Sequence, residues 1–257
     1  MGWYEKYIAF YTILMKEIRR FMRIWIQTVL PAMITTALYF VIFGNLIGER
    51  IGDMQGVRYI DYIVPGLILM TIITNSYANV VSSFYSSKFQ KNIEEMLVSP
   101  VPHYIILLGY MCGGVARGLV VGIAVTAVAV LFSDMQVHNV LVIVTFAILT
   151  AVLFSLGGFI NAVYAKSFDD ISIIPTFVLT PLTYLGGIFY TISLLPEFWQ
   201  KVSLINPILY MVNAFRYGFL GVSDINIGVS YLIVCVFIVA LFTFCVYLLN
   251  KGYGIRT

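Results

Sequence analysis

The chain has 257 residues, of which 61% are hydrophobic and only 11% are charged. Its mean hydropathy is +0.95. Soluble domains carry about 25% charged residues, so this composition excludes a water-soluble globular protein and predicts one that crosses a membrane several times. The apolar runs are too long and too continuous for the alternating strands of a membrane β-barrel. We therefore expect an all-α integral membrane protein.

Six long stretches without acidic residues mark the spans, and a single arginine interrupts one of them. A helix needs about 20 apolar residues to cross a bilayer, and each stretch is longer than this. The six predicted transmembrane helices cover residues 24–48, 62–87, 104–133, 139–164, 171–194 and 225–250. Together residues 1–257 are expected to form one transmembrane domain.

Residues 1–23 are predicted to form an amphipathic helix before the first span. Aromatic and apolar residues from Tyr4 to Met22 recur every three or four positions, and charged residues such as Lys16, Glu17 and Arg20 mostly occupy the other side. Aromatic rings with a basic face are typical of a helix that lies on the membrane surface. A basic flank that only sets the topology would explain the charges but not the periodicity.

The second span carries a stripe of polar residues three or four positions apart, and the fifth span carries another. Polar side chains in hydrocarbon need a partner or water. Such stripes either form hydrogen bonds between helices or line a translocation path, and the sequence leaves both interpretations open. The candidate path residues are Thr71, Asn75, Asn79, Ser82, Ser83, Thr176, Thr180 and Tyr184.

Residues 88–102 form a short charged segment between the second and third spans. Its apolar residues have helical spacing and are expected to share one face of a helix, which the prolines at the end of the segment stop. A short loop would be enough to connect two spans, so we interpret the segment as the handle by which a cytoplasmic partner moves the membrane domain. The candidate coupling residues are Phe89, Ile93, Glu94, Glu95, Met96, Leu97 and Pro100.

Arg117 is the charge that interrupts the third span, about 14 residues from its start. This is about 20 Å along a helix, near the middle of the bilayer. A buried arginine at that depth must pair or face water, and no span contains an acidic residue near mid-depth. Its expected partners are carbonyls, hydroxyls, water or an anionic substrate, so both a structural anchor and a substrate contact stay open.

Residues 195–221 are too polar for a span and too apolar for an ordinary loop. Two short apolar helical patterns meet at an Asn-Pro turn signal. We predict a re-entrant hairpin that enters the outer leaflet and returns. The candidate residues of this exit hairpin are Gly186, Gly187, Pro196, Asn206, Pro207 and Arg216.

The loops differ in their content of lysine and arginine. With a cytoplasmic N-terminus, ten of these residues lie on the cytoplasmic side and four on the other. Positive residues favour the cytoplasmic side, which places both termini inside. The net charge of +3 thus reflects topology and does not indicate nucleic-acid binding.

The sequence contains no catalytic constellation. There are only two histidines, and no Gly-Lys-Ser or Gly-Lys-Thr of a phosphate-binding loop occurs. The chain is therefore not expected to be an enzyme, to hold a metal or cofactor, or to hydrolyse ATP by that route. It is a transport subunit, a channel or a scaffold, and energy for uphill transport must come from a partner.

Several ordered motifs resemble the type-2 ABC-transporter permease family, whose members have the type V exporter fold. They are Gly-Gly-Ile-Phe-Tyr at 186–190, Leu-Pro at 195–196, Asn-Pro at 206–207, Phe-Arg-Tyr-Gly at 215–218 and Glu-Glu-Met-Leu-Val-Ser-Pro at 94–100. The last of these resembles the family's coupling helix.

This resemblance implies a bacterial inner-membrane protein that works as a homodimer among membrane lipids. Two cytoplasmic ABC ATPase subunits, which bind ATP and magnesium, would drive it. The implied function is export of an amphiphilic, lipid-like, drug-like or glycan substrate, with the first, second and fifth spans lining the path. A passive channel or membrane scaffold without ATP coupling is the alternative.

Overall fold

The computed structural model describes residues 2–254, without the side chains of residues 45, 46 and 49, so Met1 and residues 255–257 of the predicted domain lie outside the described residues. In the described part of the chain, five stretches are helical, long and apolar enough to cross a membrane. They are α2 (Trp25–Tyr39) with the start of the π-helix η1 (Phe40–Ile47), α4 (Tyr59–Phe89), α6 (His103–Ala129), α7 (Val140–Tyr164) and α12 (Ile227–Lys251). This confirms an all-α type of membrane protein, whereas the six-span layout stays a prediction.

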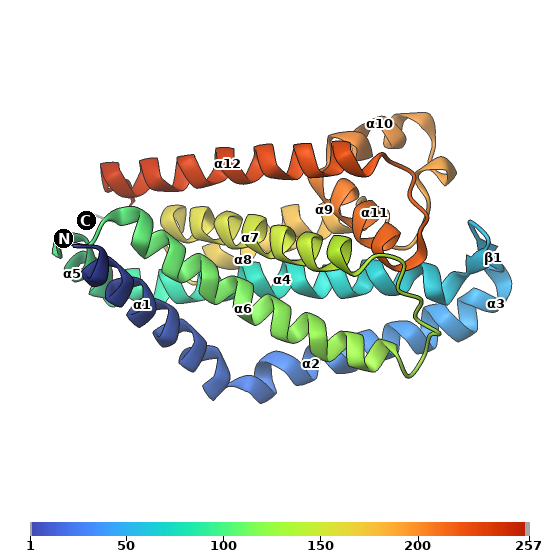
Figure 1. The fold of residues 1–257 in the computed structure, drawn as a ribbon, viewed down its shortest axis with the longest axis horizontal. Helices are drawn as coiled ribbons and strands as arrows, with labels where there is room; N and C mark the ends of the chain where they lie inside the picture. Colours follow the sequence, from blue (N-terminus) through green and yellow to red (C-terminus); the bar gives the residue numbers. More distant parts are fainter. Residues whose placement is uncertain (1, 255–257) are drawn as a thin grey trace.

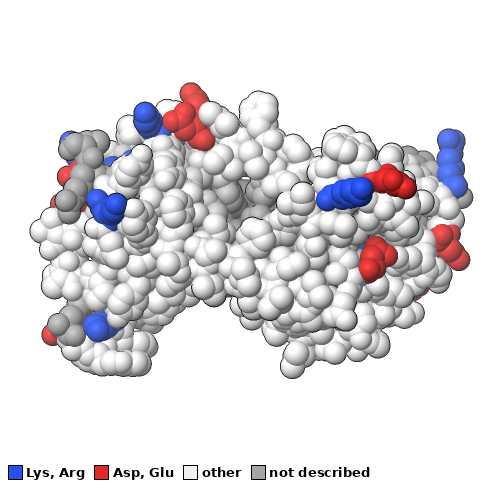
Figure 2. Space-filling view, turned by 90° about the horizontal axis from the view of Figure 1, so that it is seen from above, with Lys and Arg blue, Asp and Glu red and all other residues white. Residues whose placement is uncertain are grey.

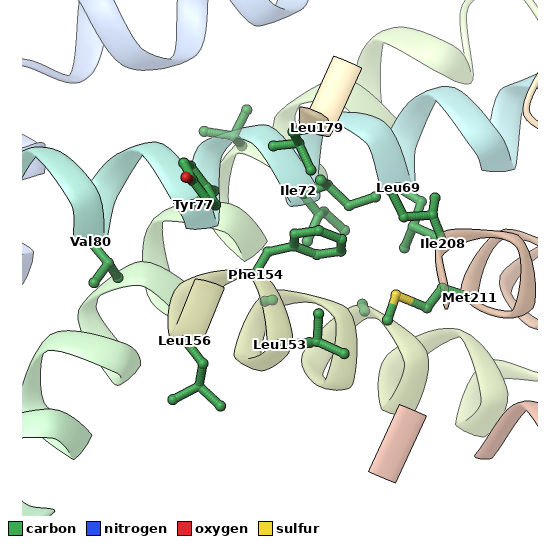
Figure 3. Close-up of a cluster of buried hydrophobic side chains, with 14 of the residues drawn as sticks. Leu69, Ile72, Tyr77, Val80, Leu153, Phe154, Leu156, Leu179, Ile208 and Met211 are labelled. Carbon is green, nitrogen blue, oxygen red and sulfur yellow. The ribbon is translucent and has the colours of Figure 1, made fainter. Parts of the chain in front are cut away.

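Helix α4 is the centre of the fold and packs along both α6 and α7. Figure 3 shows part of this core, where Ile72 of α4 lies beside Phe154 of α7, and Ile208 and Met211 of α11 (Pro207–Leu220) complete the cluster. Of the five long helices α4 is the least apolar and the most buried, whereas α12 is the most apolar and largely exposed. The polar side chains of α4 are therefore in contact with other parts of the protein, whereas α12 has mainly apolar side chains on its exposed surface.

The two ends of the molecule carry its charges. In Figure 1 the N-terminus, α5 (Asn92–Val98) and the C-terminal end of α12 lie at one end, and α3 (Gly48–Ile51), β1 (Asp53–Met54), α10 (Glu197–Ile205) and α11 lie at the other. On the face seen in Figure 2, charged residues gather toward both ends and leave a broad uncharged band between them. A protein that crosses a bilayer has this distribution. Which end is cytoplasmic stays a prediction.

The first predicted span is less regular than one α-helix. Helix α2 continues through η1 into α3, so the chain is helical from Trp25 to Ile51. The predicted external loop then contains an antiparallel hairpin of β1 and β2 (Val57–Arg58), in which Asp53 pairs with Arg58. The all-α prediction missed this hairpin because strands of two residues are too short to leave a period-two pattern.

The fifth predicted span, residues 171–194, contains Pro175 and Pro181, which predict a bend; its helix is irregular, as a bend requires, and is corrected in extent, because it ends at Tyr184. Its helical part consists of α8 (Asp170–Ile174), the π-helix η2 (Pro175–Leu179) and α9 (Thr180–Tyr184). Pro175 and Pro181 each remove a backbone donor, and in the turn after α9 Gly187 adopts a φ of +72°, a conformation that favours glycine. A 3₁₀ turn, η3 (Ile192–Leu194), follows. Figure 1 shows that this broken segment still leads from near the α5 end toward α10.

The helix expected over residues 88–102 is divided in two, which is a second correction. Helix α4 ends at Phe89 and α5 begins at Asn92, after a break in which Lys91 adopts a left-handed φ of +63°. Phe89 therefore does not share a face with Ile93. The Phe89 side chain is 65% exposed and its ring lies 5.2 Å from that of Phe168, whereas Ile93 is fully buried. The spacing of the apolar residues does not indicate this break, because it depends on a left-handed backbone conformation that lysine rarely adopts.

Candidate functional site

The N-terminal helix α1 (Trp3–Arg23) buries a carboxylate against the long helices. Glu17 is fully buried, and its Oε1 accepts a hydrogen bond from Ser83 Oγ of α4 at 2.6 Å. Arg20 Nε donates to Glu17 Oε2 at 3.4 Å. Arg20 Nη2 donates to the backbone O and the side-chain Oδ1 of Asn79, at 2.9 and 2.7 Å. The buried carboxylate of Glu17 is thus paired and hydrogen-bonded, as burial in a low-dielectric interior requires.

Lys16 extends this network to α6. Its Nζ lies 3.2 Å from Tyr110 Oη and 3.4 Å from Ser87 Oγ. Gly113 of α6 permits the close approach, since a Cβ there would lie only 2.5 Å from Cβ of Glu17. The prediction of a simple surface helix is therefore corrected: three of its charged residues face α4 and α6.

The predicted polar stripe of α4 divides into two groups. Asn79, Ser82 and Ser83 contact α1, with Ser82 Oγ 3.5 Å from Arg20 Nη1. These residues form hydrogen bonds between helices. Thr71 and Asn75, farther from α5, line a pocket instead.

That pocket lies between α2, α4 and α6, has a volume of about 310 Å³ and contains Arg117. Arg117 Nη2 donates to Asn75 Oδ1 at 3.4 Å, and its buried Nε has no hydrogen-bond partner in the described chain. The other lining residues are Gln27, Thr28, Pro31, Ala32, Thr35, Thr36, Tyr39, Leu67, Met70, Thr71 and Thr74. Arg117, the charge predicted within the third span, therefore lies in one polar pocket with Thr71 and Asn75 of the α4 stripe.

A second pocket, of about 450 Å³, lies between α4 and the broken segment α8–η2–α9. Thr176 and Thr180 line it together with Ser82 of α4, so the predicted stripes of the second and fifth spans do meet. Tyr184 lies outside it and stacks on Phe189 with ring centres 5.9 Å apart. The second pocket shares Met70 and Thr74 with the Arg117 pocket, so the two are neighbours along α4.

A third pocket, of about 740 Å³, lies beside α5 and includes Lys88 and Glu94. Lys88 Nζ donates to the carbonyl oxygens of Val163 and Ala165, both at 2.7 Å, and so caps the end of α7. Glu95 is exposed and Glu94 half-buried, while Met96 and Leu97 are half-buried and pack against the core. Both carboxylates thus reach the surface on an element that Ile93 and Lys88 fix to the long helices.

The exit hairpin is anchored by Arg216. Arg216 is one of the four basic residues counted on the non-cytoplasmic side, but its side chain is buried. Its Nη2 donates to the Gly187 carbonyl at 2.6 Å, and its guanidinium lies 3.8 Å from the centre of the Tyr62 ring. Asn206 caps α11 through Ile208 N at 3.0 Å, and its Nδ2 donates to the Leu182 carbonyl of α9 at 2.6 Å. Pro196 precedes α10, and Pro207 is the first residue of α11. Gly186 lies in the turn before these two hairpin helices.

Among residues 2–254, no three His, Cys, Asp or Glu side chains come together as metal ligands do. The polar groups that do come together, Arg117 with Asn75 and Lys16 with Glu17 and Arg20, are suited to holding charge and joining helices.

The sequence profile of the ABC-2 type transporter family matches residues 8–220. The chain is 58% identical over 251 residues to the inner membrane transport permease YadH of Escherichia coli strain K12, which covers 98% of both chains. It is 22% identical over 227 residues to nodulation protein J of Rhizobium leguminosarum bv. viciae, covering 88% of both. It is 24% identical over 217 residues to nodulation protein J of Sinorhizobium fredii, covering 84% of this chain and 82% of that protein.

These similarities confirm the resemblance drawn from the sequence motifs. With the apolar helices, they also confirm the predicted location of a multi-pass protein in the bacterial inner membrane. The role of the chain is that of a transport permease and not of an enzyme. The roles assigned to individual residues stay predictions.

Proposed function

Because the chain belongs to the ABC-2 type transporter family, we propose that it is the transmembrane subunit of an ATP-driven exporter. The working unit is a homodimer with two cytoplasmic ABC ATPase subunits, embedded in membrane lipid. ATP and magnesium bind to the ATPase partner. The cargo is an amphiphile, whether lipid-like, drug-like or a glycan, taken from the cytoplasm or the inner leaflet. Both termini and α5 face the cytoplasm.

The position of α5 supports this proposal most directly. It follows α4 after a two-residue break, and α4 lines both the Arg117 pocket and the pocket of Thr176 and Thr180. Ile93 seats α5 in the core and Lys88 ties the same end of α4 to α7. A push on α5 therefore reaches the helix that lines the pockets as a rigid-body shift.

The alternative is a passive channel or scaffold, in which α5 transmits no force. The two functions differ in what the carboxylates of α5 do. If ATPase subunits bind at α5, Glu94 and Glu95 contribute to the contact, because both belong to α5 and reach the surface.

The test is the double substitution Glu94→Ala with Glu95→Ala in the complex purified with its ATPase and reconstituted in liposomes. We expect folded dimers that still hydrolyse ATP, with substrate export reduced at least about tenfold, because loss of a charge-assisted contact is worth about 1.5–3 kcal/mol. Asp53→Ala with Glu197→Ala is the matched control, since both carboxylates are exposed at the other end of the molecule. Full export by the α5 variant, or transport that needs no ATP, contradicts the proposal.

A further inference from the structure

Arg117 has hydrogen-bond donors that the fold does not use. It makes one long hydrogen bond of 3.4 Å to Asn75 Oδ1, and its buried Nε has no partner in the described part of the chain. Arg20 and Arg216 differ: Arg20 pairs with Glu17, and Arg216 donates to a carbonyl at 2.6 Å. A cation inside a span is costly unless it is paired or hydrated. Arg117 therefore lacks the acceptors that the other two arginines have.

The walls of the Arg117 pocket supply no counter-charge, since none of its lining residues is acidic. The hydroxyls of Thr28, Thr71 and Thr74 already donate to backbone carbonyls of their own helices. A hydroxyl has a single donor hydrogen, so these groups cannot also donate to a ligand. By contrast, the exposed side-chain amide of Gln27 and the hydroxyls of Thr35 and Thr36 make no hydrogen bond within the described residues and keep their donors. The pocket thus combines an unpaired cation with an unused amide.

A second copy of the chain in a symmetric dimer would not supply a counter-charge to Arg117. None of the 12 acidic residues lies within residues 24–48, 62–87, 104–133, 139–164, 171–194 or 225–250. A partner protomer crossing the same bilayer therefore offers no carboxylate at the depth of Arg117. A negative counter-charge for Arg117 therefore has to come from outside the protein.

The neighbouring pocket is uncharged, and hydroxyl-bearing residues of the two polar stripes share its walls with apolar residues such as Val81, Phe168 and Leu179, against which an apolar group can pack. It shares Met70 and Thr74 with the Arg117 pocket, and none of its lining residues is charged. Thr74, at the junction, is exposed. A ligand with one charged end can therefore place that end at Arg117 and extend along α4 into the second pocket, whose volume is about 450 Å³.

We propose that the Arg117 pocket binds the phosphate or carboxylate group of an anionic amphiphile, and that the second pocket holds part of its apolar portion. A guanidinium fork matches the oxygens of both anions. The proposal rests on the proposed function and narrows the cargo from amphiphiles in general to anionic ones.

Binding is measured on the full-length protein in neutral detergent by fluorescence anisotropy, with tail-labelled phosphatidic acid as the probe. Tail-labelled diacylglycerol, which differs by the phosphate, is the comparison ligand, and unlabelled inorganic phosphate is the competitor. The variants are Arg117→Gln, Arg117→Lys and Gln27→Leu. Arg58→Gln is the matched control, because Arg58 is exposed and paired with Asp61 and Asp134 outside the pocket. Thermal melting and gel filtration establish that each variant is folded.

We expect the wild-type protein to prefer phosphatidic acid to diacylglycerol by at least about tenfold, and Arg117→Gln to abolish this preference, because hydrogen bonds to charged groups are worth about 1.5–3 kcal/mol. Arg117→Lys keeps the charge without the fork and should lose part of the preference, and Gln27→Leu should lose a few-fold. If Arg117→Gln does not fold, the lysine and leucine variants still carry the test. Displacement of the lipid by millimolar inorganic phosphate would show a site for the oxyanion alone and would overturn the amphiphile assignment.

The proposal is overturned if phosphatidic acid and diacylglycerol bind equally to the wild-type protein. It is also overturned if Arg117→Gln binds as Arg58→Gln does, in which case Arg117 only joins helices. Neither result touches the proposed function, which the α5 double substitution tests separately through ATP-coupled export. Conversely, uncoupled export with intact lipid preference leaves the anion site standing and removes the ATP-driven mechanism.

Discussion

At the scale of single residues, Glu17 is a buried charge whose loss should destabilise the fold. Its carboxylate is fully buried between Ser83, Lys16 and Arg20. Glu17→Ala leaves two cations near a site without their anion, and breaking a buried pair costs about 3–5 kcal/mol. We expect a loss of unfolding free energy near the lower figure, because Lys16 and Arg20 are partly exposed. Chemical denaturation of the detergent-solubilised protein measures it.

The control for this prediction is Glu5→Ala in the same helix. Glu5 is exposed and accepts a hydrogen bond from the Gly2 backbone at 2.8 Å, so its removal should cost no more than about 1 kcal/mol. Equal losses for the two variants would mean that the Glu17 network does not stabilise the fold. In that case the burial of the carboxylate would need a different explanation.

The sequence predicted Arg117 as a mid-span charge but gave no function to Glu17, and the reason is physical. Arg117 interrupts an otherwise uncharged run, whereas Glu17 lies among surface charges that look alike. One signal was present: Ile13 and Glu17 are four residues apart, as are Gly109 and Gly113, and each glycine lies against the corresponding α1 residue. Matched four-residue spacings of this kind indicate a helix contact only once the pairing of the two helices is known.

At the scale of elements, the order of helices and their composition were predictable, but their breaks were not. Long apolar runs set α4, α6, α7 and α12, because the bilayer fixes the length of a spanning helix. The break between α4 and α5 depends on the left-handed Lys91, and the turn that follows α9 depends on Gly187. Both are single backbone conformations that leave little trace in hydrophobic periodicity.

Because α5 is separated from α4, Ile93 anchors α5 to the long helices. Ile93→Ala removes a fully buried side chain, and such truncations cost about 2–5 kcal/mol. Since α5 has only seven residues, much of that loss should appear as local detachment. Hydrogen exchange followed by mass spectrometry should show residues 92–98 losing protection by at least about tenfold, with smaller changes in α6 and α7. Val98→Ala, at a position 87% exposed, should change nothing, and equal exchange in both variants would contradict the anchoring role.

At the scale of the whole molecule, the segment α8–η2–α9 determines how many times the chain crosses the membrane. Lys166 lies just before it and Glu197 lies after η3, at the start of α10, and both are exposed. Five crossings would place the termini on opposite sides, whereas Figure 1 shows the N-terminus and the C-terminal end of α12 at the same end. The predicted sixth crossing, through residues 170–190, would reconcile these observations, and it would place the pocket of about 450 Å³ shared with α4 inside the membrane.

Cysteine labelling tests this crossing directly. The three native cysteines, Cys112, Cys235 and Cys245, are first replaced by alanine, and single cysteines are then introduced as Lys166→Cys, Glu197→Cys, Asp53→Cys and Glu95→Cys. In intact spheroplasts a membrane-impermeant maleimide should label positions 53 and 197, and positions 95 and 166 only after permeabilisation, because positive-inside topology places α5 in the cytoplasm. Labelling of 166 and 197 from the same side would mean that the fifth segment enters and leaves one leaflet. The pocket of Thr176 and Thr180 would then open to a single face of the membrane and could not form part of a path across it.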